Sequence, residues 1–193
     1  SAGMSESALQ GWLLPIEAGG AFVYVPSAFV RAYEFGGVFL LDEIDAADEN
    51  LLLVINSALA NGHMMIPMRH GNPLVTRHAD FVCIAAANTH GHGADRVYAG
   101  RNQLDGATLD RFRAGTVSMS YCDTLETAIT DPFILGWGTR LRRIINEQKL
   151  RRVMSTRVLV AFSAAMADGD TLADCEESYF SDWTRDELVK AGR

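Results

Sequence analysis

The chain has 193 residues, enough for one large domain or for a core with a small satellite. Its 17 basic and 24 acidic residues give a net charge of −7, which argues against a protein that coats nucleic acid. No apolar run is long enough to cross a membrane, no secretory signal is visible, and three widely spaced cysteines exclude a disulfide framework. We therefore expect a cytoplasmic globular protein with no membrane contact.

The first predicted elements are a β-hairpin and a short helix. Residues 11–26 contain two apolar stretches on either side of adjacent glycines, which is the pattern of a hairpin. Ser27 is a suitable cap for a helix over residues 28–34, and a second pair of glycines ends that helix. The run Val38-Phe-Leu-Leu41 has no polar interruption, which predicts a strand buried on both faces.

A long helix and a second hairpin are expected next. Asp48 opens a helix over residues 49–60, which Asn61-Gly62 ends. Two short extended segments within residues 63–78 flank a turn sequence and predict the second hairpin. The remaining elements of this half are a second buried strand over 81–86, a helix over 104–112 and a strand over 116–119.

After Tyr121 the pattern changes to helices alone. Helices are expected over residues 123–130, 132–148, 156–167 and 172–180, with a last short helix opened by a capping box of Thr184 and Glu187. We therefore predict two domains, an α/β domain over residues 1–120 and an all-helical domain over residues 121–193.

The most informative string is Gly36-Gly-Val-Phe-Leu-Leu-Asp-Glu-Ile-Asp45. A buried strand that ends in adjacent carboxylates presents them at the sheet edge where α/β folds bind ligands. There Asp42 can hold the water shell of a magnesium ion, because this hard cation prefers oxygen ligands. Glu43 can then deprotonate a water that attacks a phosphate. The alternative is a strand that merely ends in solvated acids.

Asn88 and Arg111 are further candidates. Asn88 follows the second apolar strand, so we expect its amide at the same sheet edge as Glu43, next to the first strand. Arg111 ends a helix, where a planar and permanently charged guanidinium suits a phosphate in a neighbouring subunit. The ordinary alternatives are a turn-forming asparagine and a solvated arginine.

Five strings in order resemble one family. They are Gly-Gly-Val-Phe-Leu-Leu-Asp-Glu-Ile-Asp (36–45), Ala-Ala-Ala-Asn-Thr (85–89), Gly-Arg-Asn-Gln-Leu-Asp (100–105), Leu-Asp-Arg-Phe (109–112) and Ser-Thr-Arg (155–157). Together they resemble AAA+ ATPases of the MoxR-like group, near the dynein-related and phage-encoded branch. The implied fold is an α/β P-loop NTPase core with a parallel sheet, flanking helices and two hairpin inserts, followed by a helical lid.

The resemblance also implies roles for single residues. Asp42 and Glu43 would be the Walker B pair, with Asp42 on magnesium through water. Asn88 would be sensor 1, Arg111 the arginine finger and Arg157 sensor 2. The implied cofactors are ATP and Mg²⁺. The implied assembly is a ring, expected to be a hexamer, in a bacterial or phage-encoded protein that remodels a client protein.

The sequence departs from the family in one respect. A P-loop needs Gly-x-x-x-x-Gly-Lys-Ser/Thr, and no Gly-Lys pair occurs in this chain. We therefore expect a fragment that begins after the P-loop and lacks a central strand, so that the sheet has an exposed seam. Such a chain would bind ATP poorly and be inactive alone.

Two other classes of function stay open. A nucleic-acid helicase or translocase would show basic hairpin tips, yet Ile16-Glu-Ala-Gly-Gly20 is acidic, so nucleic acid is an unfavoured partner. A non-catalytic interaction module would follow if the gene has no P-loop. In the loop over 89–103, Arg96 and Arg101 could reach a phosphate across an interface, but we favour the interpretation that they are solvated loop arginines. Its two histidines lack a metal-ligand pattern.

Overall fold

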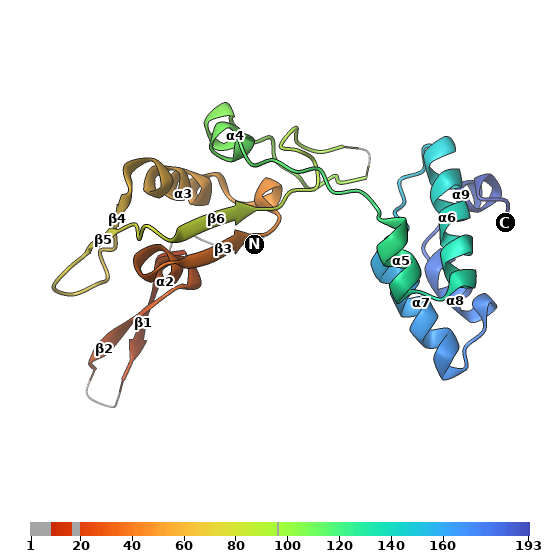
Figure 1. Cartoon of the computed structure of the whole chain (residues 1–193), viewed down its shortest axis with the longest axis horizontal. Helices are drawn as coiled ribbons and strands as arrows, with labels where there is room; N and C mark the ends of the chain where they lie inside the picture. The colour runs from red at the N-terminus through yellow and green to blue at the C-terminus, as the bar shows by residue number, and fades with distance from the viewer. Residues whose placement is uncertain (1–8, 17–19, 96) are drawn as a thin grey trace. The chain divides into compact units, whose positions relative to one another are not determined.

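The computed structural model describes residues 9–16, 20–95 and 97–193, and the chain forms two compact units (Figure 1). Unit 1 comprises residues 1–116 and unit 2 comprises residues 117–193. Each unit has its own buried apolar cluster, and each is described by itself below.

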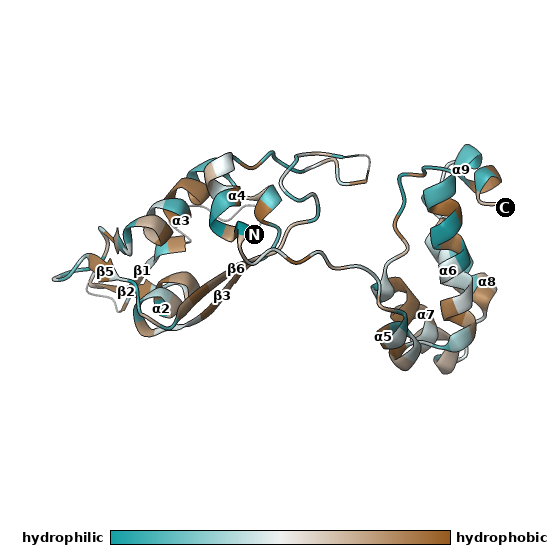
Figure 2. Ribbon diagram, turned by 45° about the horizontal axis from the view of Figure 1, so that its top comes forward, coloured by the Kyte–Doolittle hydropathy of each residue, from teal (hydrophilic) through white to brown (hydrophobic). Residues whose placement is uncertain are grey.

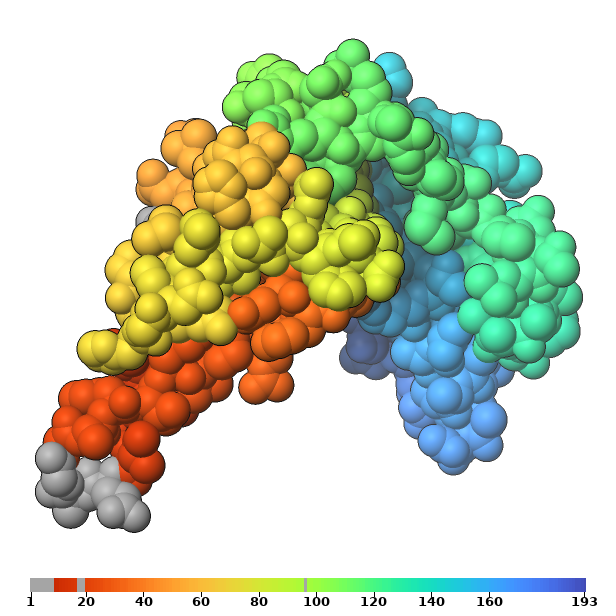
Figure 3. All heavy atoms as spheres, turned by 60° about the vertical axis from the view of Figure 1, so that its left-hand side comes forward, coloured from red at the N-terminus to blue at the C-terminus, as the bar shows by residue number. Residues whose placement is uncertain are grey.

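Unit 1 begins with the predicted hairpin and helix. Strands β1 (Gly11–Pro15) and β2 (Phe22–Pro26) pair antiparallel, and the hairpin projects from the body of unit 1 (Figure 3). Helix α2 (Ala28–Phe35) begins at Ser27, whose hydroxyl oxygen accepts a hydrogen bond of 3.1 Å from the Val30 N–H. The helix ends at Gly36, whose φ of 87° favours glycine.

The two apolar runs form a parallel pair of strands. β3 (Gly37–Leu41) and β6 (Phe81–Ala85) pair in register, with Gly37 opposite Phe81 and Leu41 opposite Ala85. One face of this pair packs on α2, where Phe29 makes edge-to-face ring contacts with Phe39 and Phe81. This packing fixes the pair on the helix, and the parallel pairing brings the carboxyl ends of both strands to one edge.

The opposite face of the strand pair is uncovered. Val38 and Leu40 are 65% and 56% exposed, and Val82 and Ile84 of β6 are 49% and 47% exposed. Figure 2 shows both strands in the brown of apolar residues. The prediction of strands buried on both faces is therefore wrong, because only the α2 side of the pair is covered within the described part of unit 1.

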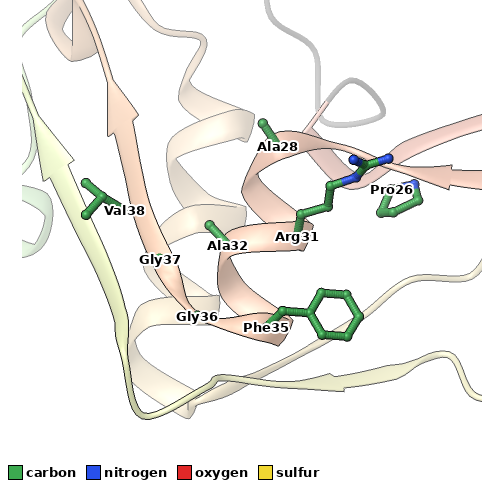
Figure 4. A pocket seen from close by; sticks show the side chains of 8 residues that line it. All are labelled: Pro26, Ala28, Arg31, Ala32, Phe35, Gly36, Gly37 and Val38. Atoms are coloured by element: carbon green, nitrogen blue, oxygen red, sulfur yellow. The ribbon is translucent and has the colours of Figure 1, made fainter.

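A hollow of about 700 Å³ extends this apolar surface away from the carboxyl edge (Figure 4). It is lined by one side of α2, where Ala28, Arg31, Ala32 and Phe35 lie, and by Gly37 and Val38 of β3. Since these residues lie at the amino end of β3, the hollow is separate from the strand-end acids.

The remaining elements of unit 1 surround the strand pair. They are the 3₁₀-helix η1 (Ile44–Ala46), α3 (Glu49–Asn61), β4 (His63–Met65), β5 (Leu74–Thr76) and α4 (Gly106–Arg113). β4 and β5 pair antiparallel, so the second predicted hairpin is confirmed. The predicted strand over 116–119 is wrong. Val117 and Met119 are 79% and 93% exposed, and no described strand pairs with this segment.

Unit 2 is built from helices. They are α5 (Asp123–Ile129), α6 (Pro132–Glu147), α7 (Thr156–Asp168), α8 (Leu172–Phe180) and α9 (Arg185–Lys190). Trp137, Leu141, Leu159 and Trp183 lie in its buried cluster. The capping box of Thr184 and Glu187 is present. Among the described residues, no helix is long and apolar enough to span a membrane. The chain is thus a mixed α/β fold with a small parallel sheet and a helical part.

Candidate functional site

The candidate site is the carboxyl edge of β3 and β6. Main-chain hydrogen bonds continue past both strands: the Ala86 N–H donates to the Leu41 carbonyl at 3.0 Å, and the Ile44 N–H donates to the Ala86 carbonyl at 2.9 Å. The segments that follow the two strands are therefore held against each other. Asp42, Glu43 and Asn88 all lie on these segments.

Asp42 is exposed directly after β3, and its Oδ1 accepts a hydrogen bond of 3.0 Å from the Glu43 N–H. Glu43 adopts left-handed backbone angles, with φ of 55° and ψ of 48°, which residues other than glycine seldom adopt. Its half-buried carboxylate accepts a hydrogen bond of 2.8 Å from Arg101 Nη2. This bond from the guanidinium lowers the pKa of Glu43.

The structure adds a residue that sequence reasoning missed, Asp45 in η1. Its side chain is fully buried, and its Oδ2 accepts three hydrogen bonds: 3.0 Å from the Asn88 N–H, 3.0 Å from the Thr89 N–H and 2.8 Å from the Thr89 hydroxyl. Nothing in the string Asp-Glu-Ile-Asp distinguishes an exposed acid from a buried one. The contact with residues more than 40 positions away arises only in the fold.

Arg101 corrects a second expectation. Its side chain is only 13% exposed, and its Nη1 lies 3.5 Å from Asp45 Oδ1. The neighbouring Asn102 N–H donates to the Asp45 carbonyl at 2.6 Å. The interpretation of Arg101 as a solvated loop arginine is wrong, because the loop is bonded to η1 and carries the guanidinium to two acids. Arg96 lies outside the described residues.

Asn88 and Arg111 have different surroundings. Asn88 is exposed, and its main chain is fixed by Asp45 at the same edge as Glu43. In α4, Leu109 and Phe112 pack on the core of unit 1. Arg111 lies between them in the sequence and is exposed. The Arg111 guanidinium donates to the Ala107 carbonyl of its own helix at 2.6 Å.

Arg157 belongs to unit 2. It is exposed as the second residue of α7, a helix that starts at Ser155, whose Oγ accepts from the Val158 N–H. The start of α7 is also held by Glu126, which accepts a hydrogen bond from the Thr156 hydroxyl. Glu126 thus holds the first turn of the helix that carries Arg157.

Glu126 is the centre of a buried ion pair. Arg142 donates to both of its carboxylate oxygens at 2.7 Å, and the two side chains are 2% and 12% exposed. Arg142 also donates from Nε to the Met154 carbonyl at 2.8 Å and stacks over the Tyr121 ring. The hydrogen bonds from Arg142 lower the pKa of Glu126. This network joins α5, α6 and the start of α7.

We expect Glu126→Ala to destabilise unit 2 by about 3–5 kcal/mol, because it leaves the buried guanidinium of Arg142 without its partner. The measurement is urea unfolding followed by fluorescence of Trp137 and Trp183, in a chain where Trp12 is replaced by phenylalanine. The control is Glu147→Ala, since Glu147 forms an exposed pair with Arg143 that contributes ~0.3–0.5 kcal/mol. Equal losses in the two variants would contradict a structural role for the buried pair.

The donor set at the edge of unit 1 suits part of a magnesium–nucleotide site. Asp42 is an exposed acid, and Mg²⁺ is commonly held by one or two carboxylates with its waters retained. Among the described residues, no three His, Cys, Asp or Glu side chains gather into a closed metal site. The part of such a site that binds the phosphates is not present, because the chain contains no Gly-Lys pair of a P-loop.

A thiol mechanism is not supported at this edge. Burial raises the pKa of Cys83 in β6 to about 11, so its thiol is protonated at neutral pH. Cys83 is therefore a small packing residue rather than a nucleophile.

Parallel strands whose carboxyl ends meet at a pair of acids and an asparagine place these polar groups at the edge where α/β folds bind ligands. Similarity to known proteins identifies the class of this core. The chain belongs to the family described as AAA domain (dynein-related subfamily), whose profile matches residues 1–112. It is also 26% identical over 157 residues to Midasin of Dictyostelium discoideum, a match that covers 75% of this chain and 3% of that protein. The family supports an ATPase-type function, and its members generally assemble into rings.

Proposed function

We propose that these residues form the hydrolytic half of an ATP site in a MoxR-like AAA+ ATPase. The parallel pairing of β3 and β6 is the observation that supports this proposal. It brings the acids that follow one strand and Asn88, which follows the other, to a single edge. Membership of the AAA family supports nucleotide as the ligand.

The chemistry assigns separate tasks to the two acids. Bound magnesium–ATP would supply the γ-phosphoryl group and a cation that offsets its charge. Asp42 would hold waters of that cation through its carboxylate oxygens. Glu43 would accept the proton of the attacking water at a carboxylate oxygen. Its side chain is held by Arg101 on one oxygen, Oε1.

Three further residues would act on the phosphate charge and the attacking water. The Asn88 side-chain amide would orient that water or the γ-phosphate. Arg111 would reach the phosphate of a neighbouring subunit as an arginine finger, since it is exposed on α4. Arg157 would contribute from the helical lid as sensor 2.

The proposed output of this site is mechanical. Hydrolysis at subunit interfaces of a ring, which we propose to be a hexamer, would drive remodelling of a client protein. A nucleic-acid motor is less favoured, since the exposed residues of the projecting hairpin are largely apolar, among them Trp12, Leu14 and Phe22.

The proposal is tested by nucleotide binding. We expect the 193-residue chain to bind ATP weakly or not at all in calorimetric titration, because it has no P-loop lysine or Gly-rich phosphate cradle. A protein that joins these residues to a P-loop is expected to bind ATP and hydrolyse it. Micromolar ATP binding by the chain alone would contradict the expectation that this chain carries the hydrolytic half of the ATP site and a P-loop carries the phosphate-binding half. Binding without hydrolysis in the joined protein would contradict the assignment of the hydrolytic half.

A further inference from the structure

We propose that Asp45 and Arg101 are positioning residues for this site: Asp45 fixes the backbone that carries Asn88 and anchors Arg101, and Arg101 holds the Glu43 carboxylate at the sheet edge. The inference rests on the proposed function only in naming Glu43 and Asn88 as the catalytic groups. The anchoring itself is a property of the chain and is tested without nucleotide.

The first step of the argument is the burial of Asp45. A carboxylate with no exposed surface is costly unless its oxygens are hydrogen-bonded and its charge is balanced. Oδ2 receives three donors from Asn88 and Thr89, so the hydrogen-bonding capacity of this oxygen is fully used. These bonds fix the main chain of the turn that follows β6, so the position of Asn88 at the sheet edge depends on Asp45.

The second step concerns the other oxygen. Asp45 Oδ1 is buried, and no group among the described residues donates a hydrogen bond to it; Arg101 Nη1 lies 3.5 Å from it. If Arg101 moved away, this buried carboxylate would lose the charge that faces it. The attraction to buried Asp45 therefore holds the Arg101 guanidinium in place. The main chain next to Arg101 is also fixed, because Asn102 bonds to the main chain of η1 and to the Ala47 carbonyl.

The third step connects this anchor to Glu43. The same guanidinium that faces Asp45 through Nη1 donates to Glu43 Oε1 through Nη2 at 2.8 Å. A planar guanidinium presents its donors in a rigid fork, so fixing one side of the group fixes the other. Glu43 meets this fork from a left-handed backbone conformation, an unusual geometry of the kind that occurs at functional positions. One buried acid thus sets the position of the Asn88 main chain and, through Arg101, of the Glu43 carboxylate.

The anchoring is tested by amide hydrogen exchange in the 193-residue chain carrying Asp45→Ala. We expect the Asn88 and Thr89 amides to exchange at least tenfold faster, because they lose their acceptor. The Ile44 and Ala86 amides bond to main-chain carbonyls and serve as internal controls that should stay protected. Unchanged exchange at Asn88 and Thr89 would overturn the role of Asp45.

The positioning of Glu43 is tested in a protein that joins these residues to a P-loop. Arg101→Gln is expected to lower kcat for ATP hydrolysis by roughly tenfold to a hundredfold with little change in KM, since displacement of a catalytic group by about 1 Å costs up to ~10²-fold. Arg101→Lys keeps one charged donor and should recover part of the loss. Arg77→Gln is the matched control, because Arg77 is exposed and its guanidinium donates to the Leu59 carbonyl of the chain rather than to an acid of the site.

The outcomes separate this inference from the proposed function. Hydrolysis by Arg101→Gln at or above the unmodified rate would overturn the positioning role and identify Arg101 as a restraint on Glu43. Equal losses in Arg101→Gln and Arg101→Lys, both through KM, would also overturn it. If the unmodified joined protein has no ATPase activity, the proposed function fails, while the exchange data on the 193-residue chain still decide the anchoring.

Discussion

Glu43→Gln is expected to suppress ATP hydrolysis by about 10²–10⁴-fold in a protein that joins these residues to a P-loop, while ATP binding is nearly unchanged. Glutamine keeps the shape of the side chain and its hydrogen-bond acceptor toward Arg101, but it cannot take a proton from water. The loss should therefore appear in kcat, and a filter-binding or calorimetric titration should give nearly the unmodified Kd for ATP.

Glu49→Gln is a suitable control for this experiment. Glu49 is also an acid that follows β3 in the sequence, but it is exposed in the first turn of α3. Its replacement should leave kcat unchanged. Hydrolysis by Glu43→Gln at the unmodified rate would show that Glu43 is only a strand-end acid that forms an ion pair.

The local patterns of the sequence predicted most elements because short-range physics determines them. Ser27 and Asp48 accept main-chain hydrogen bonds at the starts of α2 and α3, and Thr184 forms its capping box. Each is a contact between residues two or three positions apart, which a sequence displays directly. The two strands β3 and β6 also followed from local pattern, because both are short apolar runs that end in polar residues, whereas the parallel sheet that contains them was implied by the family resemblance.

The errors concern properties that depend on distant residues. An apolar run such as Val38–Leu41 predicts a strand, but burial of its second face requires a covering layer that the described part of unit 1 does not provide. The segment over 116–119 has the residues of a strand, but no strand in the described part of the chain pairs with it. Strand propensity is largely a preference for a paired and half-buried position, so it cannot by itself form a strand.

The same reason explains why two residues of the candidate site, Asp45 and Arg101, were missed. Asp42, Glu43 and Asn88 were predicted from their places after apolar runs. Asp45 and Arg101 act through contacts that span more than 40 and 50 residues, and no spacing rule connects them. A buried acid two residues after Glu43 and an arginine in a glycine-rich loop become a unit only when η1 and the loop are packed together.

Arg111→Ala is expected to abolish hydrolysis in assembled rings without unfolding the subunit. An arginine finger contributes ~10³–10⁵ to the rate in the P-loop enzymes that use one. Arg111 is exposed, and its contact is a hydrogen bond to its own helix, so its loss should change stability little. Arg113→Ala, in the exposed arginine two residues further along α4, is the matched control and should retain activity. The measurements are steady-state ATPase rate, thermal unfolding and the mass of the assembly.

Mixing two inactive variants then decides where Arg111 acts. In rings formed from Glu43→Gln and Arg111→Ala subunits, some interfaces combine an intact Glu43 from one subunit with an intact Arg111 from the next. If Arg111 serves the neighbouring site, these interfaces are complete and partial activity returns, with a maximum at intermediate mixing ratios. If Arg111 serves its own subunit, every site lacks one group and no ratio restores activity. The absence of recovery in rings of confirmed mixed composition would therefore contradict the assignment of Arg111 to a neighbour's phosphate.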